Sequence, residues 1–175
     1  FSAAERSIGL QCESLEPKIA SRLLARYTTM HAEVALGQYL DVRAEHLPLD
    51  LHNPDAIPLR EVREVVIRKS AHYSIVHPAL LGAIAAGGSE ERVQALEEAL
   101  TPWGIAFQLR DDDLGVFGDP EVTGKPAGDD LREGKRTMLL SLSWKNASVA
   151  EREILAGVLG DEKASPDSIA RATEV

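Results

Sequence analysis

Apolar residues recur at helical spacing along almost the whole chain, and this pattern limits the fold more than any other feature. In the longest example, residues 17–46, the apolar positions lie three or four residues apart, as on one side of an α-helix. They are Ile19, Leu23, Leu24, Tyr27, Met30, Val34, Leu36 and Leu40. Alternating β-branched runs, which would indicate strands, are missing from the sequence. The chain is therefore predicted to be all-α.

Proline, glycine and capping residues mark where the expected helices begin and end. Pro78 lies inside one long helical segment and should kink or break it, because proline lacks an N–H and its ring clashes with the preceding turn. Thr101-Pro102 is typical of a helix start, so we expect a new helix there rather than a continuation. Ser148 and Glu151 form a capping-box pattern. The expected helices span residues 3–11, 17–46, 59–87, 90–100, 102–117 and 138–144, and two more start after Ser148 and Ser165.

Length, charge and cysteine content narrow the class of protein. The 175 residues suffice for a single domain, or for part of a larger one, with a buried core. A net charge of -9 argues against a nucleic-acid partner, whose binding surface would be basic. No apolar run reaches the roughly 20 residues of a membrane span. Cys12 is the only cysteine, which excludes an internal disulfide and favours a cytoplasmic location.

The densest carboxylates of the chain lie within an otherwise apolar helix. Asp111, Asp112 and Asp113 are adjacent, and their mutual repulsion and poor helix propensity make this run unfavourable without an external partner. Gln108, Asp111, Asp112 and Gly115 fall on one side of the helix, and we call these four residues the acidic stripe. Two carboxylates and an amide on one side can hold Mg²⁺, which prefers oxygen ligands.

A solvated acidic turn near a helix end is the alternative interpretation of the acidic stripe. Apolar residues on both sides of the stripe should pull the segment inward, and this argues against a merely solvated turn. The side chains expected to pack around the stripe are Trp103, Phe107, Leu114 and Phe117.

Two lysines stand on glycine-containing backbone after the acidic stripe. Lys125 lies in the segment TGKP and Lys135 in GKRT, and lysines beside backbone N–H groups suit a diphosphate. The glycine–lysine pattern of a P-loop is missing. A second acidic group follows Lys125, and it could join a metal cluster or pair with Arg132 and Arg136; we favour pairing. Its members are Asp129, Asp130 and Glu133.

Lys69 is a further candidate, in the middle of another expected helix. It shares an expected helix face with Tyr73 and Val76. That face also includes Val66, so Lys69 should point partly inward, where a buried ammonium group needs an anionic partner. A lysine that extends along the helix edge into solvent is the alternative.

Other polar residues carry weaker signals. Gln38 and Asp41 lie on one apolar stripe, where polar groups are more often structural hydrogen-bonding partners than ligands. The histidines show no spacing typical of metal ligands, and no metal site is expected among them. They are His31, His46, His52, His72 and His77.

Taken together, these elements resemble the trans-isoprenyl diphosphate synthase (polyprenyl synthetase) family, in particular synthases of the geranylgeranyl and farnesyl diphosphate type. FQLRDDDLGVFGD is similar to the second aspartate-rich motif of that family, and TGKPAGDDLREGKRT to the loop that follows it. VIRKSAHY is similar to the helix with a Lys-Thr/Ser pair, and EVALGQYLDV to the GQ-x-x-D helix. The resemblance implies an isoprenoid synthase fold, with antiparallel helices around a central cavity, here incomplete. Residues 1–175 would be the middle-to-late part of one such domain, without the first aspartate-rich motif and without the C-terminal helices.

The resemblance also implies a function. The expected enzyme is a Mg²⁺-dependent prenyltransferase of isoprenoid biosynthesis, a homodimer that condenses an allylic diphosphate with isopentenyl diphosphate. The 175-residue chain by itself is expected to be inactive. A class I terpene cyclase and a catalytically silent subunit with the same helical shell are the alternatives.

Individual residue roles follow from the same resemblance. The implied metal ligands are Asp111, directly, and Asp112, in support. The implied catalytic residues are Lys69, Lys125 and Gln108, with the lysines holding the allylic diphosphate. The implied substrate-binding residues are Ser70, Tyr73, Gln38 and Lys135. Gly115 stands where the family usually has a further aspartate, so the motif lacks one carboxylate here.

Overall fold

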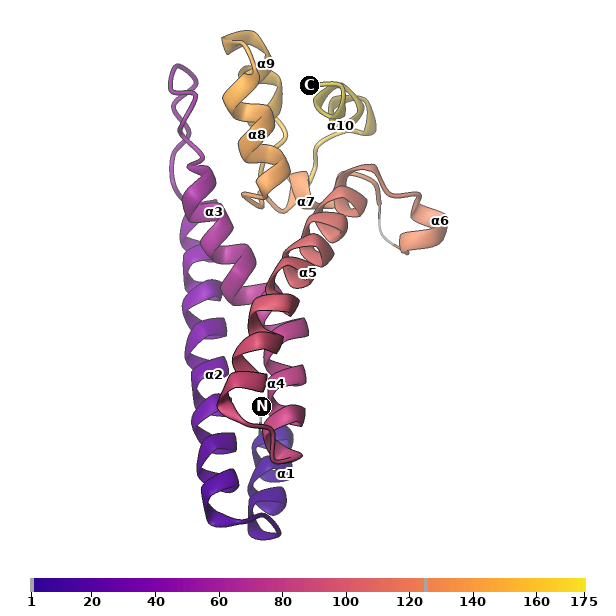
Figure 1. Ribbon diagram of the computed structural model, residues 1–175. Helices are drawn as coiled ribbons and strands as arrows, with labels where there is room; N and C mark the ends of the chain where they lie inside the picture. The colour runs from indigo at the N-terminus through magenta and orange to yellow at the C-terminus, as the bar shows by residue number, and fades with distance from the viewer. Residues whose placement is uncertain (1, 125) are drawn as a thin grey trace. The chain divides into compact units, whose positions relative to one another are not determined.

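The computed structural model describes residues 2–124 and 126–175 of the chain (Figure 1). Every regular element in these two ranges is a helix, so the all-α prediction is confirmed. The elements are α1 (Ser2–Glu13), α2 (Pro17–Glu45), α3 (Leu59–Val65), η1 (Val66–Val76), α4 (His77–Ala85), α5 (Glu90–Phe117), α6 (Pro120–Thr123), α7 (Asp129–Arg132), α8 (Met138–Asn146), α9 (Val149–Ala156) and α10 (Pro166–Thr173). Within the same ranges, no helix is both long enough and apolar enough to cross a membrane.

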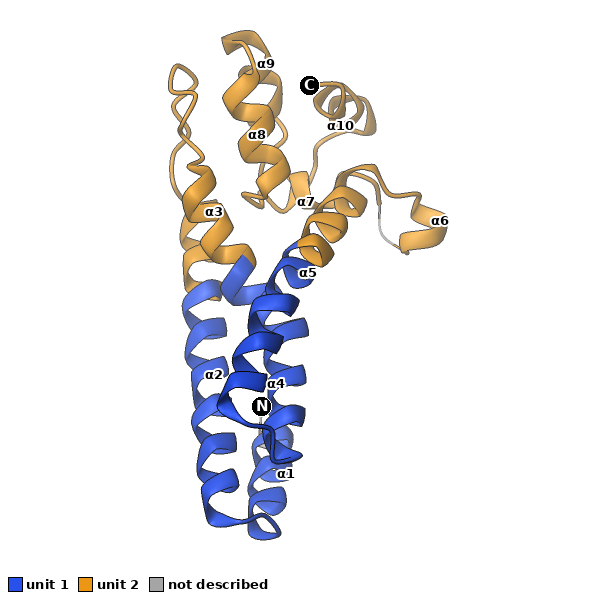
Figure 2. Cartoon of the chain, in the orientation of Figure 1, with its two compact units in different colours: residues 1–37, 67–105 blue, residues 38–66, 106–175 orange. Residues whose placement is uncertain are grey.

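The chain divides into two compact units (Figure 2). Unit 1 comprises residues 1–37 and 67–105, and unit 2 comprises residues 38–66 and 106–175. Each unit has an apolar core of its own. In unit 1, Leu23 and Val76 are among the fully buried core residues, and in unit 2 the largest is Trp144. Burying one such side chain stabilises a fold by roughly 1.5–3 kcal/mol, so each core is a substantial source of stability.

Hydrogen bonds to backbone carbonyl groups fasten the loop at residues 47–58 within unit 2. The indole Nε1 of Trp144 donates to the carbonyl of Asn53 at 3.0 Å. The buried guanidinium of Arg152 donates to the carbonyl of Leu51 at 3.0 Å and to that of Trp144 at 2.8 Å. These buried donors are therefore paired, which avoids the cost of leaving a buried polar group without a partner.

Most of the expected helix boundaries are confirmed. The long second helix begins at Pro17 and ends at Glu45, one residue from its expected end. The Ser148 hydroxyl accepts from the backbone N–H of Glu151, and the Glu151 carboxylate accepts from the backbone N–H of Ser148. This reciprocal pair is the capping box that the sequence predicts. Ser165 caps α10 in the same position of the last helix.

The expected new helix at Thr101-Pro102 is wrong. α5 runs from Glu90 to Phe117 without a break, and Pro102 lies inside it. The Thr101 hydroxyl donates to the carbonyl of Glu97 at 2.7 Å, so a side chain bonds to the backbone in the turn that proline weakens. Proline removes one backbone hydrogen bond, and the rest of a 28-residue helix outweighs that loss here.

The expected break at Pro78 takes the form of a change of helix type. The segment from Val66 to Val76 is a π-helix, and α4 restarts at His77 with Pro78 in its first turn. A π-helix has i→i+5 hydrogen bonds and more residues in each turn than an α-helix. Side-chain directions predicted for an α-helix therefore do not hold in η1.

Candidate functional site

The acidic stripe forms a hydrogen-bonded group on α5 in unit 2. The side-chain amide of Gln108 donates to Asp112 Oδ1 at 2.7 Å and to Asp111 Oδ2 at 3.4 Å. Asp112 is only 5% exposed, whereas Asp111 faces solvent. The amide of Gln108 thus holds both carboxylates on the same side of the helix, as the i, i+3 and i+4 spacing predicts.

The surroundings of Asp112 disfavour the charged form of its carboxyl group. Burial raises its pKa to about 6, and the negative charges of Asp130 and Asp111 add to this increase. The hydrogen bond from Gln108 and the charge of Lys135 oppose the increase without cancelling it. A cation next to Asp112 would therefore remove an unfavourable interaction that the folded chain otherwise retains.

Gly115 makes room for a carboxylate that comes from another helix. A Cβ atom at position 115 would lie 2.6 Å from Cγ of Asp130, which is far inside van der Waals contact. Asp130 belongs to α7 and is buried. The motif lacks a carboxylate at Gly115, but the side chain of Asp130 reaches the same place on α5. The stripe therefore has a third nearby carboxylate that the motif itself does not encode.

Lys135 is held by this second acidic group. Its Nζ lies 2.6 Å from Asp130 Oδ1 and 2.6 Å from Glu133 Oε2. Although burial opposes it, these two hydrogen bonds raise the pKa of Lys135, so the side chain stays an ammonium ion. The expected pairing with Arg132 is wrong, because Arg132 donates instead to the carbonyl of Ala127 at 2.9 Å.

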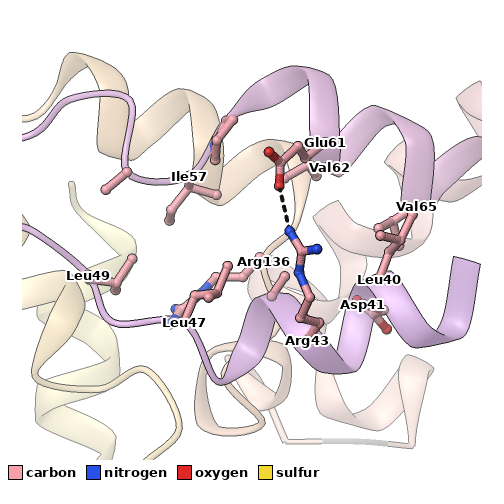
Figure 3. A pocket seen from close by; sticks show the side chains of 13 residues that line it. Leu40, Asp41, Arg43, Leu47, Leu49, Ile57, Glu61, Val62, Val65 and Arg136 are labelled. Atoms are coloured by element: carbon pink, nitrogen blue, oxygen red, sulfur yellow. Dashed lines mark ion pairs between the residues drawn. The ribbon is translucent and has the colours of Figure 1, made fainter.

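Arg136 does not pair with the second acidic group either. It lines a small cavity of about 40 Å³ in unit 2, together with Asp41, Arg43 and Glu61 (Figure 3). Among the described residues, its buried Nη1 has no hydrogen-bond partner. Burial lowers the pKa of Arg136, and the charge of Glu45 opposes this. The cavity has space for about one to three water molecules, and water can reach such a group.

The remaining expected site residues do not belong to this group of side chains. Lys69, Ser70 and Tyr73 lie on η1 in unit 1, and Gln38 is an exposed residue of α2 in unit 2. Lys125 lies outside the described residues. The structure thus brings together Gln108, Asp111, Asp112 and Lys135, and it describes the η1 residues as part of a separate unit.

The predicted inward face is wrong for Tyr73, whereas Lys69 is partly buried, as expected. Val76 is fully buried, but Tyr73 is 42% exposed, so the two residues do not share an inward face. The cause is the π-helix, in which residues three and four apart are rotated differently than in an α-helix. Lys69 itself is half-buried.

The apolar residues expected to pack around the acidic stripe are exposed instead. The buried positions of this part of α5 are Asp112 and Val116, four residues apart, and this spacing defines the inward side of the helix. Residues next to them in sequence point elsewhere. The exposed fractions are 73% for Trp103, 53% for Phe107, 36% for Leu114 and 55% for Phe117.

The sequence shows no metal-ligand spacing among the histidines, but the structure brings two of them together with a carboxylate in a group that could hold a metal ion. His72 and His77 meet Glu33 in unit 1, with possible ligand atoms within 4.8 Å of one another. The two histidines are five positions apart in sequence, a spacing that would place them on different sides of an α-helix. The signal for this group was therefore hidden by the unexpected π-helix.

Comparisons with known proteins agree with the resemblance. The sequence profile of the polyprenyl synthetase family matches residues 8–175. The short chain isoprenyl diphosphate synthase of Methanothermobacter thermautotrophicus is 34% identical over 156 residues, which are 88% of this chain and 46% of that protein. The (2E,6E)-farnesyl diphosphate synthase of Mycobacterium bovis is 30% identical over 169 residues, 95% of this chain and 44% of that one. The chain thus spans somewhat less than half the length of these curated relatives.

A solved structure shows the same fold. The geranylgeranyl pyrophosphate synthase of Corynebacterium glutamicum, crystallised with isoprenyl diphosphate and magnesium, superposes with a TM-score of 0.78. It is 41% identical, and the match covers 91% of this chain and 43% of that one. The isoprenoid synthase fold expected from the sequence is therefore confirmed, as an incomplete version of that of its relatives.

Proposed function

The chain belongs to the polyprenyl synthetase family, and from this premise we propose that it forms part of the catalytic domain of a Mg²⁺-dependent prenyltransferase. The proposed reaction joins an allylic diphosphate to isopentenyl diphosphate and yields a longer polyprenyl diphosphate. Relatives along most of this chain are named as isoprenyl and farnesyl diphosphate synthases, which supports the choice of substrate class. We propose only a part of the catalytic domain because the matched relatives are about twice as long as this chain.

One observation carries the proposal, namely the group of carboxylates on one side of α5. Asp112 is buried near Asp111 and Asp130, and burial and their charges raise its pKa. Such an arrangement is costly unless a cation shares it. The donors are all oxygen atoms, the kind that Mg²⁺ prefers, and Mg²⁺ usually keeps open positions for substrate phosphates. The residues therefore fit magnesium, and the related structure crystallised with magnesium and isoprenyl diphosphate supports the same choice.

Asp111 and Asp112 would hold the metal, and Gln108 would keep both carboxylates in place through its amide. Magnesium bound there would neutralise charge on the diphosphate as it leaves. Asp130, which approaches the stripe at Gly115, is a third carboxylate available to the same site. Lys135 already bonds Asp130, so it would remain close to the phosphates as a fixed positive charge.

Other residues would bind the allylic diphosphate and its hydrocarbon chain. Lys69 and Lys125 would bind the allylic diphosphate, and Ser70 would help to position it. The allylic C–O bond breaks with its electron pair on the diphosphate oxygen, and the double bond of isopentenyl diphosphate attacks the resulting carbocation. The proton then lost passes to the released diphosphate. Gln38 and Tyr73 would line the hydrocarbon side, where exclusion of water protects the cation.

Location and assembly complete the proposal. A homodimer is supported by large apolar side chains that remain exposed on α2, such as Tyr39 at 62% and Val42 at 44%. A cytoplasmic enzyme is supported by Cys12, which is a free thiol in the structure and suits a reducing compartment.

Binding of inorganic pyrophosphate by the 175-residue chain tests the proposed site without requiring turnover. Calorimetry with and without Mg²⁺ should show binding only when the metal is present. Asp111→Asn and Asp112→Asn should each weaken it by roughly tenfold or more, a loss of about 1.4 kcal/mol. Asp113→Asn is the matched control, because Asp113 is the adjacent aspartate and pairs with Arg110 instead of Gln108. Equal binding by all three variants would refute the assignment.

A further inference from the structure

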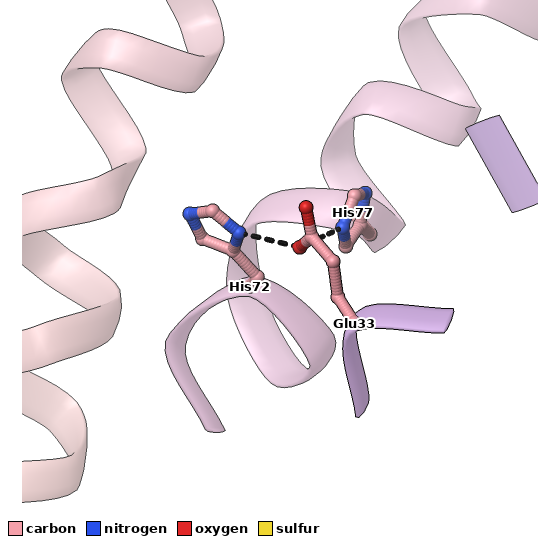
Figure 4. Close-up of side chains that lie close together, drawn as sticks. All are labelled: Glu33, His72 and His77. Atoms are coloured by element: carbon pink, nitrogen blue, oxygen red, sulfur yellow. Dashed lines mark hydrogen bonds and ion pairs between the residues drawn. The ribbon is translucent and has the colours of Figure 1, made fainter. Parts of the chain in front are cut away.

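Glu33, His72 and His77 form a compact group of metal-ligand side chains in unit 1 (Figure 4). Oε2 of Glu33 lies 2.8 Å from Nδ1 of His72 and 3.0 Å from Nε2 of His77. One oxygen atom therefore faces two imidazole nitrogens. The ligand atoms of all three residues lie within 4.8 Å of one another. None of these residues belongs to the acidic stripe.

The π-helix is what brings the two histidines together. In an α-helix, residues five apart are separated by about 140° around the axis, because each residue turns the chain by about 100°. The wider turn of a π-helix reduces this separation, since its hydrogen bonds join residues five apart. η1 ends at Val76, directly before His77. The rings of His72 and His77 lie 5.6 Å apart, nearly perpendicular to each other, which places them on one side.

Close backbone packing fixes η1 in this position within unit 1. A Cβ atom at Gly37 of α2 would lie 2.7 Å from the backbone nitrogen of Lys69, and one at Gly104 would lie 2.8 Å from Cα of Ala71. Both glycines thus let neighbouring backbones approach η1 more closely than any other residue would allow. His72 follows Ala71 directly, so its backbone lies next to the contact with Gly104. The group is consequently built on rigid helices, as a preformed ligand site requires.

We propose that Glu33, His72 and His77 bind one zinc ion in unit 1. Two imidazole nitrogens and one carboxylate oxygen are a ligand set that Zn²⁺ accepts in proteins, with a fourth position left for water. Ligand atoms on a tetrahedral zinc ion stand roughly 3.3 Å apart, given bonds of about 2.0–2.1 Å. The two N–O distances of 2.8 and 3.0 Å are slightly shorter, so each of these pairs would separate by a few tenths of an ångström around the ion, and the two nitrogens lie within 4.8 Å of each other.

The ion would act as a cross-link between helices. Glu33 comes from α2, His72 from η1 and His77 from the start of α4. His77 is 1% exposed, and the side chains of His72 and Glu33 are 17% and 23% exposed, so access is from the side of these two. Zinc bound to the native group but not to the unfolded chain stabilises the fold by mass action. The bound ion would therefore hold α2 against the segment that includes Lys69 and Ser70.

Titration of the metal-free 175-residue chain with Zn²⁺, and separately with Co²⁺, tests this site. Excess Mg²⁺ is present throughout to occupy the acidic stripe. We expect one zinc per chain, a higher melting temperature with zinc, and the visible absorption of tetrahedral Co²⁺. Glu33→Gln and His72→Gln should each weaken zinc affinity by at least about a hundredfold, because each removes a direct ligand. His52→Gln, at an exposed loop histidine, is the matched control and should bind zinc normally.

Far-UV circular dichroism establishes that each variant is folded, and His72→Gln, at a partly exposed side chain, should remain so. Asp111→Asn with Asp112→Asn provides a further comparison, and this double variant should retain zinc binding. The proposal is overturned if the parent chain binds zinc no more tightly than His72→Gln does. It is also overturned if zinc binding is lost in the double aspartate variant but retained in His72→Gln. Either result would leave the proposed magnesium site unaffected.

Discussion

The effect of Gly115→Ala on the free energy of unfolding tests whether the side chain of Asp130 occupies the space next to Gly115. The substitution should destabilise the protein if Asp130 lies there, and stabilise it if position 115 is an ordinary helix position. In a helix interior, alanine is more favourable than glycine by about 0.5–1 kcal/mol. At position 115, however, the new Cβ would lie 2.6 Å from Cγ of Asp130, so the carboxylate has to move. Movement of Asp130 breaks its 2.6 Å contact with Lys135, whose side chain is 32% exposed.

The expected loss can be derived from these contacts. Breaking a fully buried ion pair by displacing one partner costs about 3–5 kcal/mol. Because Lys135 is one-third exposed, solvent screens the pair, and we reduce the cost to about 2–3 kcal/mol. After the gain in helix propensity, Gly115→Ala should lower the free energy of unfolding by about 1–2 kcal/mol.

Urea denaturation followed by circular dichroism measures this difference directly. Gly82→Ala in α4 is the matched control, because among the described residues no atom beyond its chain neighbours and its own helix backbone lies within 4 Å of a Cβ built there. It should raise the free energy of unfolding by about 0.5–1 kcal/mol. If Gly115→Ala stabilises the chain as Gly82→Ala does, Asp130 does not occupy the space next to Gly115. Asp130 would then not be a third carboxylate of the proposed metal site.

Three other substitutions test separate parts of the account. Because the folded-state pKa of Asp112 is raised to about 6, the metal-free protein should lose stability as pH increases from about 4 to 6. Asp112→Asn should remove this pH dependence and raise the free energy of unfolding by up to about 3 kcal/mol at pH 8. Urea denaturation at several pH values measures both effects. Arg152→Met leaves the carbonyls of Leu51 and Trp144 without donors, so a loss of about 3 kcal/mol or more is expected in the same assay; a loss below 1 kcal/mol would contradict it. Lys69→Ala in the complete gene product should reduce turnover by on the order of a hundredfold, and a near-normal rate in a product assay would show that Lys69 does not act on the diphosphate.

The sequence predicts most of the helices, for reasons that are local. Apolar spacing, the Ser148 capping box and the helix start at Pro17 each depend on residues close in the chain, and all are found in the structure. The acidic stripe is similar in kind, because an i, i+3, i+4 spacing fixes which side chains share a face. The hydrogen bonds from Gln108 to Asp111 and Asp112 follow from that spacing alone.

What sequence reasoning missed depends on contacts between helices or on backbone that departs from α-helical geometry. The π-helix before Pro78 changes which residues share a face, so the direction of Tyr73 and the meeting of His72 with His77 could not be obtained from α-helical spacing. The same applies to Asp130, which reaches Gly115 only because α7 packs beside α5 in unit 2. Local rules gave the wrong partner for the second acidic group, since they favoured nearby arginines over Lys135.

Incorporation of labelled isopentenyl diphosphate by the complete gene product tests the central claim most directly. With Mg²⁺ and an allylic diphosphate, we expect the label to enter a linear polyprenyl diphosphate longer by whole isoprene units, and we expect chelation of the metal to abolish this incorporation. Two results would exclude a prenyltransferase: no incorporation by a protein that still binds pyrophosphate and Mg²⁺, or a cyclic hydrocarbon formed from the allylic diphosphate alone.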